Sequence, residues 1–296
     1  MTTSNFMRPI ALLIAVTLVT SAIIYKKYYK KPAPPPDTNA LAANSVSIKN
    51  TIIPQEGVEI PITWGDIGKR LIDTGTIDQI PFESIYEARG GIGEVKRLTS
   101  GREDTAIVIN RENAGILLNL LWAFGLSNKN DILENGPIAS GKYGGDPSRF
   151  ASTAGWTLAK GNPMNHYNKH EFIRLTNDEQ NKVENVSKGI YRPCCANSTH
   201  FPDCNHGMAM LGLLQLLAKE GMSENEMYDI ALKVNSYWFP DTYMTIGEYF
   251  EKRHIAWADV DPKTVLGAEY SSAVGYRRVL EEINPVEGGA GGGCSA

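Results

Sequence analysis

Residues 191–221 read YRPCCANSTHFPDCNHGMAMLGLLQLLAKEG, and this stretch decides the fold that we predict. From Gly207 to Ala218 every position except Gln215 is apolar or glycine. A helix without a polar stripe is buried on all sides, and about a dozen residues are too few to cross a bilayer. The sequence therefore predicts a mainly α-helical fold, with a single globular domain around a buried central helix at about residues 206–220.

Patterns on both sides of this stretch predict further helices. A second core helix is expected over residues 111–126, capped by Asn110, because its apolar residues recur at helical spacing. Capping boxes at Thr176–Glu179 and Ser223–Glu226 open two more helices. Residues 45–64 are rich in β-branched residues and predict an extended arm. The remaining expected elements are helices at 66–73, 82–88, 242–253 and 269–283, and a short strand at 105–109.

The first half of the opening stretch contains the pattern C-C-x8-C-x-H, formed by Cys194, Cys195, Cys204 and His206. Thiolate and imidazole ligands suit zinc, cuprous copper or an iron–sulfur cluster. The spacing is that of neither a zinc finger nor a haem attachment site. Adjacent side chains diverge, so the tandem cysteines point weakly to a cluster with several irons. We therefore predict that these four residues bind a transition metal (Zn, Cu or Fe) or an iron–sulfur cluster.

Cys204 is expected at the N-terminus of the central helix, with Asp203 or Asn205 as the capping residue. The helix dipole would favour the thiolate there. Two alternatives remain open for the same cysteines. They form disulfides if the domain lies outside the cytoplasm, or they form a redox-active pair in which Cys204 attacks and Cys194 or Cys195 resolves. The absence of C-x-x-C counts against the redox pair.

Three further residues are candidate metal ligands. His166 and His170 are four apart, so on a helix they would share a face and could chelate one metal. Their natural partners would be the cysteines, although an exposed pair is the commoner explanation. Cys294 stands on the glycine-rich end EGGAGGGCSA, where eight flexible residues reach about 15 Å. This arm could bring Cys294 to the other cysteines as a ligand, disulfide partner or metal-transferring thiol; the alternative is an unpaired thiol.

The N-terminal residues predict a membrane anchor. Residues 10–25 carry no charge and are followed at once by four lysines within residues 26–31. At about 1.5 Å per residue the run reaches about 24 Å, and snorkelling lysines with interfacial tyrosines cover the shortfall to the hydrocarbon thickness of about 30 Å. A cleaved signal peptide is the rival, but the cleavage site is poor. We predict an uncleaved single-pass anchor in residues 1–31.

A Pro/Ala-rich linker at residues 32–46 follows the anchor, then the helical globular domain at 47–285 and a flexible tail at 286–296. Such a linker is typical of a surface-displayed domain and favours an extracytoplasmic location. The lysines favour the cytoplasmic side instead, so that side remains open. The net charge is −4 and the globular domain has no basic stripe, which argues against nucleic acid as a partner. The membrane is the one partner indicated.

These observations predict a membrane-anchored Cys/His metal- or iron–sulfur-binding protein that handles metal or transfers electrons. The alternatives are a thiol–disulfide redox protein and a noncatalytic helical surface module stapled by disulfides. Neither a G-x-S-x-G nor a phosphate-binding loop is present, and the glycine-rich segment 135–165 is expected to cover the site as an ordered loop. Whether the protein is an enzyme is left open.

Overall fold

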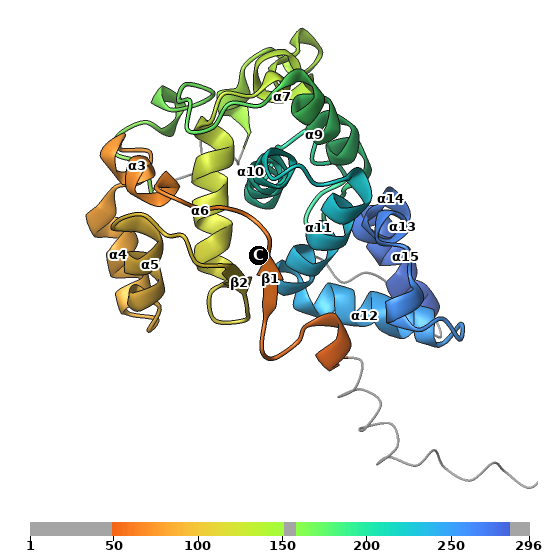
Figure 1. Ribbon diagram of the computed structural model, residues 1–296. Helices are drawn as coiled ribbons and strands as arrows, with labels where there is room; N and C mark the ends of the chain where they lie inside the picture. The colour runs from red at the N-terminus through yellow and green to blue at the C-terminus, as the bar shows by residue number, and fades with distance from the viewer. Residues whose placement is uncertain (1–48, 151–157, 285–296) are drawn as a thin grey trace, which may run out of the picture. The chain divides into compact units, whose positions relative to one another are not determined.

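The computed structural model describes residues 49–150 and 158–284, which are mainly α-helical (Figure 1). The predicted anchor, linker and tail, with Cys294, lie outside the described residues. Within the described part, no helix has both the length and the apolar character that crossing a bilayer requires. The α-helices include α3 (Ile67–Asp73), α4 (Gln79–Glu87), α5 (Ile92–Thr99), α6 (Ala114–Ser127), α7 (Asp131–Asn135), α9 (Asn177–Gly189), α10 (Asn205–Lys219), α11 (Glu224–Trp238), α12 (Pro240–Glu251), α13 (Pro262–Leu266), α14 (Ala268–Ser271) and α15 (Ala273–Ile283).

Helix α10 is the predicted central helix, and the prediction is confirmed. Every residue from Gly207 to Ala218 is buried. The helix lies among α6, α9 and α11, and its most extensive packing is against α6 (Figure 1). Because burial of one leucine side chain contributes about 1.5–3 kcal/mol, this helix supplies a large share of the core. Its N-terminal end is thereby held in a fixed place.

Helices α6 and α10 touch backbone to backbone at a pair of glycines. A Cβ atom on Gly212 would lie 2.4 Å from the carbonyl oxygen of Leu121, and one on Gly125 would lie 2.2 Å from that of Met208. Both distances are shorter than van der Waals contact, so only glycine permits this approach. The glycines of the two apolar segments therefore set the distance between the two core helices.

The predicted extended arm contains strand β1 (Val58–Ile60), which pairs antiparallel with β2 (Ile107–Ile109). Val58 lies opposite Ile109 in this register. The arm is fastened on both sides of β1. The Tyr237 hydroxyl donates to the Pro54 carbonyl at 2.7 Å, and the Trp64 indole donates to the Leu98 carbonyl at 2.8 Å.

Both capping boxes are present, at the N-termini of α9 and α11. Several boundaries differ from expectation, and two of these differences have a clear local cause. Helix α6 begins at Ala114 rather than at 111, because the Asn110 side chain accepts from the backbone N–H of Glu112 and Asn113 and closes a turn there instead. The expected helix at 269–283 is divided, because the Ser272 hydroxyl caps a new helix, α15. Helix α5 was not predicted, since its start lies among glycines.

Candidate metal centre

The cysteines lie in the loop between α9 and α10, which we call the cysteine loop (residues 190–204). The loop doubles back on itself through an isolated bridge between Tyr191 and Ser198. A turn closes where the backbone N–H of Cys195 donates to the Arg192 carbonyl at 3.2 Å. From outside the loop, the backbone N–H of Ala273 in α15 donates to the Cys195 carbonyl at 2.9 Å. The loop is therefore held both by its own turn and by a neighbouring helix.

The loop brings three sulfur atoms together. The Sγ atom of Cys204 lies 3.4 Å from that of Cys194 and 4.0 Å from that of Cys195, and all three lie within 4.8 Å of one another. The expectation that the adjacent side chains diverge from one site is wrong, because the turn at Arg192 directs both to Cys204. No disulfide joins the three, which are free thiols. Cys194, Cys195 and Cys204 form a cluster that could hold a metal, and we call it the cysteine cluster.

His206 lies beside the cysteine cluster on the first turn of α10. Its Nδ1 atom is 3.9 Å from the Sγ atom of Cys194. The other side of the imidazole packs on Phe239, with ring centroids 4.3 Å apart, and on Trp238 at 6.0 Å. Trp238 and Phe239 therefore support the ring of His206. The structure brings the three cysteines of the C-C-x8-C-x-H pattern together, with His206 next to Cys194.

Cys204 is itself the N-cap of α10. Its Sγ atom accepts from the backbone N–H of Gly207 at 3.4 Å and from Nε of Arg192 at 3.1 Å. The expected caps, Asp203 and Asn205, do not take this position, because the Asp203 carboxylate is occupied by Arg192 at 2.7 Å. Hydrogen bonds from the Cys194 and Cys195 thiols, together with the Arg192 guanidinium, lower the pKa of Cys204. Cys204 is thus the first of the three to become a thiolate.

The other two thiols keep their protons more strongly. Hydrogen bonds with Cys195 and Cys204 raise the pKa of Cys194. For Cys195, the hydrogen bond with Cys194 acts to lower the pKa, but the bond to Cys204 and burial outweigh it and raise the pKa to about 11. One thiolate is therefore stabilised by two neighbouring S–H groups. A soft metal ion would replace those two protons.

Arg192 is the residue of this site that the sequence analysis missed. Its side chain has no exposed surface, and it binds the Cys204 sulfur through Nε and the Asp203 carboxylate through Nη2. Burial alone would lower the pKa of Arg192, but the charges of Cys204 and its neighbours outweigh burial and raise it. The only cue in the sequence is an arginine two residues before the tandem cysteines.

The glycine-rich segment contacts the cysteine loop through aromatic side chains. The ring of Phe201, in the middle of the loop, packs against Tyr143 at 5.0 Å and against Phe150 at 5.1 Å between centroids. The Phe201 carbonyl accepts from Nη2 of Arg192 at 3.3 Å. The described part of this segment therefore contacts the loop at Phe201, whose carbonyl binds Arg192.

The structure places the histidine pair apart from the cysteine cluster. His166 and His170 lie on a turn rather than on an α-helix, yet their Nδ1 and Nε2 atoms are 3.0 Å apart. The backbone of His170 pairs with Asn128, whose side chain binds Gln215 near the far end of α10 from Cys204. The expected joint site with the cysteines is therefore not formed. Burial lowers the pKa of both imidazoles.

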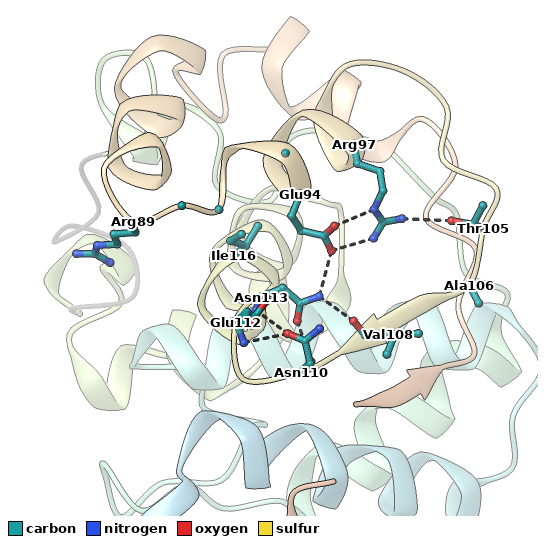
Figure 2. Close-up of a pocket in the computed structure, with 13 residues that line it drawn as sticks. Arg89, Glu94, Arg97, Thr105, Ala106, Val108, Asn110, Glu112, Asn113 and Ile116 are labelled. Carbon is teal, nitrogen blue, oxygen red and sulfur yellow. Dashed lines mark hydrogen bonds and ion pairs between the residues drawn. The ribbon is translucent and has the colours of Figure 1, made fainter. Parts of the chain in front are cut away.

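A polar cavity of about 810 Å³ lies between α5, β2 and the start of α6, and the sequence analysis did not anticipate it (Figure 2). Two of its charged side chains, Glu94 and Arg97, bind each other. The Glu94 carboxylate accepts from Arg97 at 2.8 Å and from the Asn113 amide at 3.0 Å, and Arg97 also contacts Thr105 (Figure 2). The hydrogen bond from Arg97 lowers the pKa of Glu94. The pair of Glu94 and Arg97 therefore stabilises this part of the cavity wall.

No family model, curated protein or solved structure matches this chain. The functional argument therefore rests on the chemistry of the site. Three sulfur atoms lie within 4.8 Å of one another, the His206 imidazole lies 3.9 Å from one of them, and the buried Arg192 guanidinium binds Cys204.

Proposed function

We propose that Cys194, Cys195 and Cys204 bind one thiophilic metal ion as thiolates, with His206 as the fourth ligand. The observation that carries this proposal is the spacing of the sulfur atoms. Two thiolates at about 2.3 Å from a tetrahedral metal ion lie about 3.8 Å apart. The distances of 3.4 and 4.0 Å from Cys204 lie on either side of this value.

A single ion fits this spacing better than an iron–sulfur cluster. In a [4Fe–4S] cluster each cysteine binds a different iron, and in a [2Fe–2S] cluster no more than two cysteines share one iron, so three sulfur ligands of a cluster do not converge on one ion. The tandem cysteines, whose sulfur atoms both lie near Cys204, have the opposite arrangement. Zinc and cuprous copper are ions that accept thiolate and imidazole ligands.

The exposure of the ligands supports metal handling rather than a purely structural role. Cys194 is exposed, and Cys195, Cys204 and His206 are each partly exposed. An incoming or departing ion can therefore reach Cys194 first, while Arg192 and the N-terminus of α10 hold Cys204 from the buried side. Such a site exchanges its ion with solvent or with another thiol more readily than a closed one.

The uncharged run at residues 10–25 and the lysines after it support the further proposal that the chain is anchored in a membrane, with the metal site on the extracytoplasmic side. Membrane fractionation of the full chain and of a chain lacking residues 1–31 tests this anchor. Recovery of both chains in the soluble fraction would contradict it.

The test of metal binding is elemental analysis of the full chain purified without oxygen, followed by titration with Co²⁺ as a spectroscopic substitute for zinc. We expect about one zinc or copper per chain, and an intense sulfur-to-cobalt absorption band with the visible bands of a tetrahedral ion. Cys204→Ser should abolish the sulfur band. His206→Asn should keep that band and weaken binding by about 10–100-fold, since one of four ligands is lost.

His200 offers a matched control, because it lies in the same loop and its imidazole contacts Ser187 instead of the cysteine cluster. His200→Asn should bind Co²⁺ as the unaltered chain does. The proposal fails if the reduced chain contains no stoichiometric metal and shows no sulfur-to-cobalt band.

A further inference from the structure

We infer that the cysteine cluster is also a thiol switch, in which a hydroperoxide joins Cys194 and Cys204 in a disulfide while Cys195 remains a thiol. Formation of the disulfide removes two of the three sulfur ligands and releases the metal. The release step rests on the proposed function, whereas the choice of the cysteine pair rests on the geometry of the metal-free site.

The distances select the pair. Of the two pairs that include Cys204, the one with Cys194 has the shorter Sγ–Sγ distance, 3.4 Å compared with 4.0 Å for Cys195. The adjacent pair, Cys194 and Cys195, is disfavoured by its backbone. Consecutive Cα atoms across a trans peptide are about 3.8 Å apart, whereas an unstrained disulfide needs about 4.4–6.8 Å.

Contacts of the Cys195 sulfur and carbonyl fix this residue in place, so that it does not take part in the reaction. Its sulfur lies 3.8 Å from both the Asp203 carboxylate and the Asn197 carbonyl, either of which can accept its one S–H hydrogen. Its own carbonyl is fixed by Ala273 of α15. Cys194, by contrast, is exposed to solvent. It can therefore move the short distance to Cys204 without breaking such contacts.

The reaction needs only the peroxide and the two thiols. The Cys204 thiolate attacks one peroxide oxygen, the O–O bond breaks, and the products are a sulfenic acid on Cys204 and hydroxide. The Cys194 sulfur then attacks the Cys204 sulfur, an S–S bond forms, and the sulfenic oxygen leaves as water with the thiol proton. In total two thiols are oxidised and one peroxide is reduced to two waters.

Loss of metal follows from the ligand count. After oxidation only the Cys195 thiol and the His206 imidazole remain of the four proposed ligands. A two-ligand site does not compete for zinc with a chelator, so release should be complete once the disulfide has formed. A thiol reductant restores all three sulfur ligands and hence the binding site.

The test uses the full chain, reduced and freed of metal, treated with one equivalent of hydrogen peroxide and assayed for free thiols. We expect it to lose two of its four thiols. Cys195→Ser should lose two thiols at a similar rate, because the reacting pair is intact. Cys194→Ser should lose them at least about tenfold more slowly. Alkylation and fragmentation mass spectrometry should place the disulfide between Cys194 and Cys204.

A second stage adds zinc to the reduced chain, then peroxide, and follows release with a coloured zinc indicator. Zinc should appear in step with the disulfide. Equal rates for Cys194→Ser and Cys195→Ser, or a disulfide to Cys294, would overturn this inference even if zinc binds. Failure of the reduced chain to bind zinc would overturn the proposed function and the release step, while the thiol counts would still decide which pair reacts.

Discussion

The Arg192 guanidinium donates from Nε to the Cys204 sulfur at 3.1 Å, although the Arg192 side chain has no exposed surface. Its Nη2 atom donates to the Asp203 carboxylate at 2.7 Å. A buried cation is stable only when anions and hydrogen bonds offset its loss of hydration. Folding of the cysteine loop and ionisation of Cys204 therefore depend on each other. The buried arginine is one of the groups that lower the pKa of Cys204, after the hydrogen bonds from Cys194 and Cys195.

Arg192→Met should destabilise the metal-free chain by about 3–5 kcal/mol, because it leaves the Asp203 carboxylate and the Cys204 sulfur without their cation. Arg174 is the matched control, since its side chain is 82% exposed and contacts Glu171 only at 3.8 Å. Arg174→Met should change the stability by no more than about 0.5 kcal/mol. Urea unfolding of the three reduced chains measures the difference. Equal losses in both variants would show that the buried contact contributes nothing.

Gly207→Ala should destabilise the chain by about 1–3 kcal/mol, because a Cβ atom there would lie 2.5 Å from Cζ of the immobile Arg192 guanidinium. It should also weaken metal binding, since the same clash displaces the group that binds Cys204. Gly115 in α6 is the control, because a Cβ atom there meets nothing within 4 Å. Gly115→Ala should instead stabilise the chain by up to about 1 kcal/mol. Thermal unfolding and Co²⁺ titration of both variants provide the comparison, and stabilisation by Gly207→Ala would refute the argument.

The sequence was sufficient to predict the central helix and to single out the three cysteines that lie together. A run of apolar residues without a polar stripe, from Gly207 to Ala218, has one stable location, which is the core. The short spacing from Cys204 to His206 places both at the start of that helix. These are local relationships, and local relationships can be predicted from residue order.

What the sequence could not supply are contacts between distant or irregular segments. The convergence of Cys194 and Cys195 on one point depends on the turn that the Arg192 carbonyl closes. Cys204 rather than Asp203 caps the helix, because the Asp203 carboxylate already binds Arg192. The separation of the histidine pair from the cysteine cluster depends on its pairing with the end of α6. None of these has a signal in the spacing of residues.

Zinc binding should release about two protons per chain near pH 8, rather than three. Two hydrogen bonds from its neighbours and the Arg192 charge hold the pKa of Cys204 below its usual range, so that this thiol is already ionised. The pKa of Cys195, about 11, and the raised pKa of Cys194 keep the other two protonated until metal arrives. The apparent affinity should therefore rise about 100-fold per pH unit between pH 7 and 8. Calorimetry in buffers of different ionisation enthalpy counts the protons, and a value near three would mean that Cys204 is not preionised.

The histidine pair should make the fold sensitive to mild acid. Burial lowers the pKa of both His166 and His170 from 6.5, and Lys169 opposes a positive charge on either ring. The unfolded chain therefore binds protons at a higher pH than the folded chain does. The contribution of the two neutral histidines to the stability of the fold is complete above about pH 6.5. It is lost as the pH falls through the lowered pKa values of the histidines in the folded chain. Replacement of both histidines by glutamine should make the free energy of unfolding fall less between pH 7 and 5, as measured by urea unfolding. Replacement of the exposed His254 by asparagine is the control and should leave this fall unchanged. The same slope in all three chains would mean that the pair remains unprotonated in both states or is not buried in solution.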